Sequence, residues 1–97
     1  MSTEVESITS IDIKIPKLYK VILLNDDFTP MQFVVEVLLD IFNKTQSEAE
    51  ALTLEVHQKG SGIAGIFTRE VAEQKVDDTI AVAAHNGHPL KAVAETT

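Results

Sequence analysis

The sequence predicts an α+β fold, a two-layer sandwich in which a three-stranded antiparallel sheet is covered by three helices. Two observations predict it: the segments follow the order strand, helix, helix, strand, helix, strand, and each strand segment is short. A sheet of three strands cannot bury its own apolar face, so the helices must pack against it. The chain has 97 residues, which suits a single domain with one core.

Three short segments have the composition of strands. Residues 18–24 are rich in aliphatic and β-branched residues, and the turn-forming residues Asn25, Asp26 and Asp27 follow them. Residues 63–67 and 90–94 form the second and third predicted strands, the last one after Pro89. Residues 1–17 are polar and acidic with isolated aliphatic residues and no sustained period, which predicts a flexible N-terminal tail before a folded domain of residues 18–97.

The first helix is predicted to begin at Thr29, with Thr29 as the N-cap, Pro30 at the first helical position and Gln32 completing a capping box. Polar residues then recur three or four positions apart as far as Asn43, so one polar stripe runs along an otherwise apolar helix. The valines within residues 34–37 favour a strand because they are β-branched, but the cap and the stripe outweigh them.

Two more helices follow. The second begins with a capping box formed either by Thr45 and Glu48 or by Ser47 and Glu50, carries Leu52 and Val56 on one face, and ends at Gly60. The third is capped by Thr68 and ends at Gly87, with four apolar residues at i+4 spacing: Ala72, Val76, Ile80 and Ala84.

Composition excludes several classes of function. The formal charge is −7 and the basic residues are scattered singly, so no basic patch is expected to bind nucleic acid or an anionic membrane. The chain has no cysteine, which excludes a disulfide framework and a thiolate nucleophile. Its acidic N-terminus lacks the pattern of a secretory signal, so we expect a cytoplasmic protein.

Two motifs invite chemical interpretations. The string Gly60-Ser-Gly-Ile-Ala-Gly65 matches a dinucleotide-binding pattern, but it leaves a helix and enters a strand, the reverse of the order that aims amides at a pyrophosphate. Asp26 and Asp27 could be the acid and base groups of a hydrolase, with His57 assisting. Alternatively, the two aspartates could simply form a turn, or they could provide a fixed negative charge beside an apolar pocket. No metal site is expected, because the three histidines lie in separate places without cysteine.

Residues 19–34, Tyr-Lys-Val-Ile-Leu-Leu-Asn-Asp-Asp-Phe-Thr-Pro-Met-Gln-Phe-Val, strongly resemble the signature segment of the ClpS family, bacterial adaptors of the Clp protease. Three further blocks match in order and spacing: residues 52–57 followed by Gly60, residues 63–75, and His88-Pro-Leu90. The similarity covers about residues 18 to 95 and leaves out the tail.

The resemblance implies a non-enzymatic adaptor that binds a free α-amino group and a first residue that is Phe, Tyr, Trp or Leu. It places the amino-group site on Asn25, Asp26 and His57. It places the side-chain pocket on Thr29, Met31, Val34, Thr53, Val56 and Leu90, with Met31 at the mouth. Thr53 departs from the family, where this position is commonly Met.

The resemblance also implies a partner, the N-terminal domain of a ClpA-type unfoldase, which would dock on Glu70 and Lys75. We expect a monomer without cofactor or metal. The alternatives are a modulator that binds the unfoldase without using a degron pocket, and a hydrolase built on Asp26, Asp27 and His57.

Overall fold

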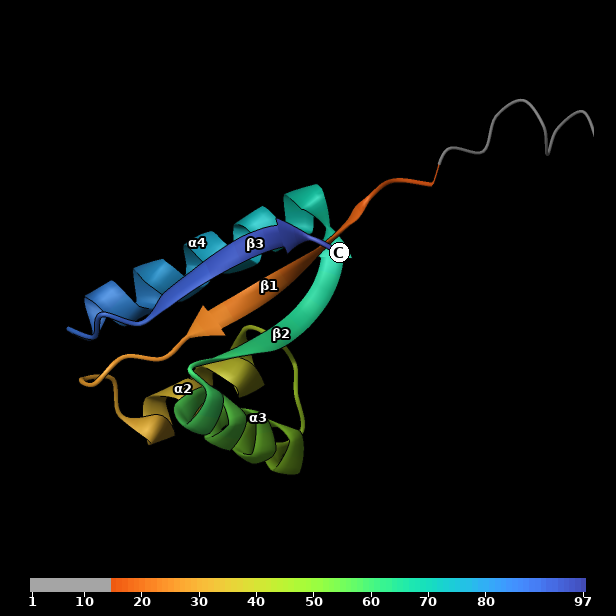
Figure 1. Cartoon of the computed structure of the whole chain (residues 1–97). Coiled ribbons are helices and arrows are strands. Elements are labelled where there is room, and N and C mark those ends of the chain that lie inside the picture. Colours follow the sequence, from red (N-terminus) through yellow and green to blue (C-terminus); the bar gives the residue numbers. More distant parts are fainter. Residues whose placement is uncertain (1–14) are drawn as a thin grey trace, which may run out of the picture.

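The computed structural model describes residues 15–97, and residues 1–14 of the predicted tail lie outside them. The element order is β1 (Leu18–Leu24), α2 (Met31–Asp40), α3 (Gln46–Lys59), β2 (Ser61–Thr68), α4 (Arg69–His85) and β3 (Lys91–Thr96). Figure 1 shows the three strands side by side with the helices packed against them, and the α+β prediction is confirmed. No helix in the described part of the chain is both long enough and apolar enough to span a membrane.

The first strand occupies the middle of the sheet. The strand order is β2-β1-β3, and β1 pairs antiparallel with both neighbours. Leu24, the last residue of β1, lies opposite Ser61 at the start of β2 and Lys91 at the start of β3. The turn after β1 therefore leaves the sheet where α3 ends and β3 begins. A hydrogen bond of 2.9 Å from the Asn25 amide to the Gly60 carbonyl ties that turn to the end of α3.

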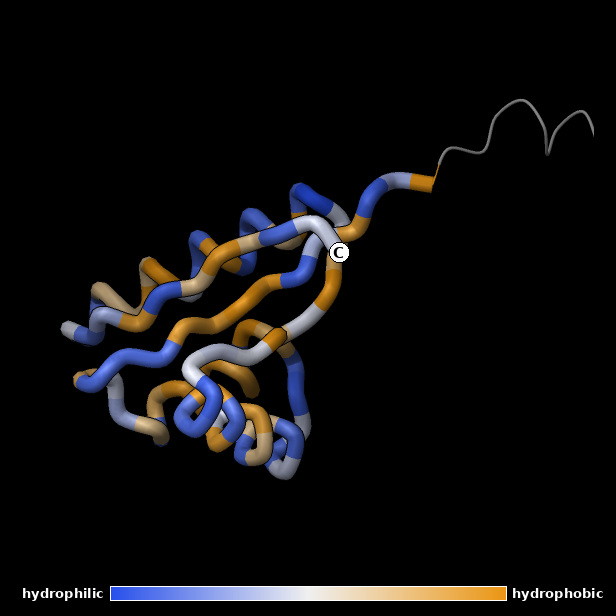
Figure 2. The backbone as a smooth tube through the Cα atoms, in the orientation of Figure 1, coloured by the Kyte–Doolittle hydropathy of each residue, from blue (hydrophilic) through white to orange (hydrophobic). Residues whose placement is uncertain are grey.

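One face of the sheet forms the core with all three helices. Val21 and Leu23 of β1 are fully buried, and they belong to the same cluster as Val34 of α2, Val56 of α3 and Ala72 of α4. Figure 2 shows that β1 is apolar along most of its length and that the turn after it is hydrophilic.

The opposite face of the sheet is only partly buried. Ile22 lies across from Ile63 on one side and from Val93 on the other, and both partners are exposed. The core of the described residues therefore lies between the helices and the sheet face that carries Val21 and Leu23.

The predicted start of the first helix is wrong in detail. Helix α2 has Pro30 as its N-cap and no side-chain cap. The Thr29 hydroxyl instead donates a 2.7 Å hydrogen bond to Asp26, which orients it toward the turn after β1. Phe33 and Val34 satisfy their amides on the Pro30 carbonyl. The carboxylate three residues upstream thus fixes the Thr29 side chain away from the cap position.

Helix α3 begins and ends as its local sequence predicts. Of the two possible capping boxes, Thr45 with Glu48 is the one present. Gly60 closes the helix with φ at 92°, a left-handed conformation that glycine adopts without strain. Gly62 then allows β2 to pass close to the helix, because a β-carbon there would lie 2.9 Å from a Val56 methyl group.

Helix α4 turns a different face to the core than its i+4 row predicts. The buried residues are Ala72, Thr79 and Ala83, whereas Ile80 is 43% exposed and Ala84 is also exposed. Successive steps of four residues rotate around a helix by about 40° each, so a strict i+4 row drifts off one face. Thr79 tolerates burial because its hydroxyl donates to the Lys75 carbonyl at 2.8 Å.

Candidate functional site

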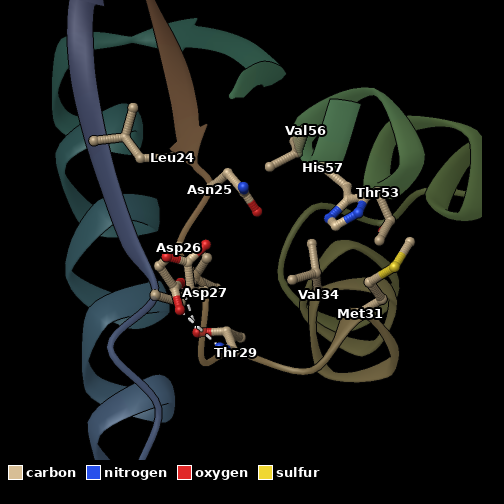
Figure 3. A pocket seen from close by; sticks show the side chains of 11 residues that line it. Leu24, Asn25, Asp26, Asp27, Thr29, Met31, Val34, Thr53, Val56 and His57 are labelled. Carbon is tan, nitrogen blue, oxygen red and sulfur yellow. Dashed lines mark hydrogen bonds between the residues drawn. The ribbon is translucent and has the colours of Figure 1, made fainter. Parts of the chain in front are cut away.

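A cavity of about 170 Å³ lies where the end of β1, the start of α2 and the last turns of α3 meet (Figure 3). One wall is the turn after β1, and the other walls are apolar side chains from the helices and the segment before β3. The lining residues are Leu24, Asn25, Asp26, Asp27, Thr29, Met31, Val34, Thr53, Val56, His57 and Leu90.

The cavity brings together all nine side chains that the sequence assigns to the amino-group site and the side-chain pocket. Two further lining residues, Leu24 and Asp27, were not assigned. Asp27 shares a turn with two assigned residues, and this adjacency was a usable signal. Nothing in the sequence marks Leu24, the last residue of a strand, as a lining residue.

The Asp26 carboxylate organises the turn. One of its oxygens, Oδ1, accepts hydrogen bonds from the Phe28 amide at 2.8 Å and the Thr29 amide at 2.7 Å. The other, Oδ2, accepts from the Thr29 hydroxyl at 2.7 Å. A carboxylate offers about four acceptor positions, so one remains for a further donor. These three hydrogen bonds hold the Asp26 carboxylate, and with it a negative charge, on the wall of the cavity.

Burial and hydrogen bonding act in opposite directions on Asp26. Partial burial tends to raise its pKa, but the hydrogen bonds from the Thr29 hydroxyl and the Phe28 and Thr29 amides, together with the charge of nearby His88, lower the pKa below its ordinary value. Asp26 is therefore anionic at neutral pH.

Two further hydrogen-bonding groups face the cavity from opposite sides. Figure 3 shows the Asn25 side-chain amide and the His57 ring pointing toward the same space. Asn25 is held by its backbone bond to Gly60, and His57 lies in the last turn of α3, three residues before that glycine. The end of α3 thus fixes both groups relative to each other.

The apolar part of the cavity is built from well-packed residues. Val34, Val56 and Leu90 all belong to the buried core. Met31 is 44% exposed and stands at the first position of α2, where it can act as a movable edge. Thr53 is buried, but its hydroxyl oxygen has no hydrogen-bond partner in the described structure.

The two residues assigned to partner docking differ in their surroundings. Glu70 is exposed in the first turn of α4. Lys75 is partly buried, and its ammonium group donates a 2.6 Å hydrogen bond to the carbonyl of Ile41, the C-cap of α2. Lys75 therefore ties α4 to the end of α2, a contact between residues 34 positions apart that the sequence did not indicate.

Comparison with known proteins identifies the family. A family model described as the ATP-dependent Clp protease adaptor protein ClpS matches residues 14–93. A ClpS adapter protein of Deinococcus radiodurans is 56% identical over 82 residues, covering 84% of this chain and 73% of that protein. One from Acetivibrio thermocellus is 47% identical over 93 residues, covering 96% and 94%.

A solved structure agrees with both the sequence and the fold. It is that of Agrobacterium tumefaciens ClpS2 bound to L-phenylalaninamide, which is 35% identical and superposes with a TM-score of 0.83 over 86% of this chain and 100% of that one. The relatives are named as adaptors and not as enzymes. The chain belongs to the ClpS family, the adaptor proteins of the ATP-dependent Clp protease.

Proposed function

We propose that this chain is an N-degron adaptor: it binds the free α-amino group and the first side chain of a substrate, Phe, Tyr, Trp or Leu, and delivers that substrate to a ClpA-type unfoldase. The observation that carries the proposal is that one cavity has an anionic turn as one wall and core residues as the others. A chain start is a cation joined to a side chain, so both halves are needed to bind it.

The amino-group half of the cavity fits an ammonium ion. An α-ammonium group has three donors, and Asp26 supplies the negative charge together with its remaining acceptor position. The Asn25 side chain and the His57 ring hold either the ammonium group or the first peptide unit, since both point into the same space. An acetylated chain start has lost the charge and two of its donors, so it should not bind.

The apolar half fits one large side chain. Burying an aromatic side chain is worth roughly 2 to 3 kcal/mol, and each charge-assisted hydrogen bond adds about 1.5 to 3 kcal/mol. After the cost of association, these contributions suggest an affinity in the micromolar range. An internal phenylalanine lacks the ammonium group and should be ignored.

The position of Met31 gives a basis for choosing among first residues. At the mouth of the cavity it would crowd substituents on the β-carbon of a ligand, so Ile and Val should be rejected while unbranched β-carbons enter. The ligand of Agrobacterium tumefaciens ClpS2, L-phenylalaninamide, combines a free amine with an unbranched β-carbon and an aromatic ring.

Delivery requires a docking surface away from the cavity. Glu70 is available on the exposed first turn of α4, where the unfoldase domain would bind. Lys75 also belongs to this surface. Its ammonium group already donates to the Ile41 carbonyl, so an unfoldase partner would share that ammonium group with Ile41.

A fluorescence titration with a Phe-initiated peptide and its acetylated counterpart tests the proposal. The free peptide should bind with an affinity in the micromolar range, and equal binding of the two peptides would contradict the proposal. Asp26→Asn is the sharpest variant, because an amide can still accept from the Phe28 and Thr29 backbone while the charge is lost. It should weaken binding by about tenfold or more. Glu36→Gln, on the exposed side of α2, makes the same charge change outside the cavity and should have no effect.

The same variant separates the adaptor from a modulator that only occupies the unfoldase. If Asp26→Asn abolishes peptide binding but keeps its full effect on unfoldase-dependent degradation of all substrates, the modulator is the correct description. If the variant selectively loses the degradation of substrates that begin with a large residue, the result supports the adaptor.

A further inference from the structure

Thr53 carries an unexplained polar group in the cavity wall. Its side chain is 3% exposed, and Oγ1 is the one buried side-chain nitrogen or oxygen without a hydrogen-bond partner among residues 15–97. A second buried threonine provides the comparison: the Thr79 hydroxyl donates to the carbonyl four residues earlier at 2.8 Å. Thr53 occupies the same kind of helical position, and its hydroxyl makes no such bond.

A buried hydroxyl without a partner is unfavourable, so a ligand that supplies the partner gains affinity. Thr53 lines the same cavity as the proposed amino-group site and lies one helical turn before His57 on α3. The four-residue step between them rises about 6 Å along the helix axis, which is comparable with the length of a tyrosine side chain. A ring that enters beside His57 and runs along α3 ends near Thr53.

We propose that the Thr53 hydroxyl makes the cavity selective for a first residue with a polar group at the far end of its ring, that is, tyrosine over phenylalanine. This inference rests on the proposed function and assigns a specificity role to one wall. The phenol and the threonine hydroxyl are each donor and acceptor, so either can donate to the other.

The contact requires a small rearrangement. Oγ1 has almost no exposed surface of its own, so the hydroxyl must turn toward the cavity by rotation about χ1, which also carries the threonine methyl group to a new position. Threonine populates two χ1 rotamers in helices, which makes such a rotation accessible. The exposed Met31 side chain lies beside Thr53 in Figure 3 and can shift as the ring enters.

The inference is tested with two peptides that differ only in starting with Tyr or Phe, titrated against wild type, Thr53→Val and Thr53→Ser. Wild type should bind the Tyr peptide about three- to tenfold more tightly, the range expected for one neutral hydrogen bond. Thr53→Val keeps the shape of the wall without the hydroxyl, so the ratio of the Tyr and Phe affinities should fall to about one. Thr53→Ser keeps the hydroxyl, and it should keep the preference for Tyr.

The outcomes distinguish this inference from the proposed function. If wild type binds both peptides equally, or if Thr53→Val keeps the preference for Tyr, the selectivity inference is wrong and the adaptor function stands. If neither free peptide binds better than its acetylated form, the proposed function is wrong, and the inference is wrong with it.

Discussion

The same substitution at two buried threonines should change stability in opposite directions. Thr53 and Thr79 both lie inside helices with almost no exposed surface, at 3% and 0%. Replacing either by valine exchanges a hydroxyl for a methyl group of similar shape. The change in intrinsic helix propensity is the same at both sites and therefore cancels in the comparison.

The magnitudes follow from the hydrogen-bond partners. At Thr53 the substitution removes an unpartnered hydroxyl and buries an extra methyl group, so Thr53→Val should raise the free energy of unfolding by about 1 kcal/mol. At Thr79 it removes a 2.8 Å bond to the Lys75 carbonyl. Thr79→Val should therefore lower the free energy of unfolding by about 1 kcal/mol.

Urea denaturation and a thermal melt of the three proteins, without peptide, measure the difference. For a domain of this size, 1 kcal/mol corresponds to a shift in Tm of roughly 4 to 8 °C, so the two variants should bracket wild type clearly. Urea m-values should be unchanged, which shows that the native fold is retained. If Thr53→Val is destabilised as much as Thr79→Val, the Thr53 hydroxyl has a partner in solution and the reasoning fails.

Three further predictions concern the cavity. Thr53→Met should add apolar contact at the wall of the cavity that Thr53 forms, and it should strengthen binding of a Leu-initiated peptide relative to a Phe-initiated one. An unchanged ratio of the two affinities in titrations would show that this wall does not select between them. Asp26 has a lowered pKa, so its contribution to stability should be fully present above the ordinary carboxyl pKa of about 4 and should be lost as the pH falls through the lower folded-state value. The difference in unfolding free energy between wild type and Asp26→Asn should shrink over that acidic range, and a difference independent of pH would contradict the role of the charge. Gly62→Ala places a β-carbon 2.9 Å from Val56 and should destabilise the fold by about 1 to 3 kcal/mol and weaken peptide binding, whereas Ala at the exposed Ser47 should do neither.

The features predicted well from sequence depend on groups close together along the chain. The left-handed Gly60 and the extent of β1 are decided within a few residues. So is the capping box of α3, for which the sequence left Thr45 with Glu48 and Ser47 with Glu50 as alternatives. The cavity residues were found because the turn after β1, the end of α3 and Leu90 lie in blocks that resemble one family. The start of α2 was predicted wrongly although its cause is also local, since Asp26 orients the side chain of Thr29 toward the turn.

By itself, the sequence determined the order of strands and helices, and it predicted turn and helix residues that prove to line one cavity. Short-range hydrogen bonds and apolar periodicity suffice for the elements, and the spacing of the matching blocks suffices for the family. Only the tertiary structure decided which face of α4 is buried, that Lys75 donates to Ile41, and that Thr53 is left without a partner. Each of these depends on which atoms from distant segments meet in the packed core, and neither composition nor spacing specifies that.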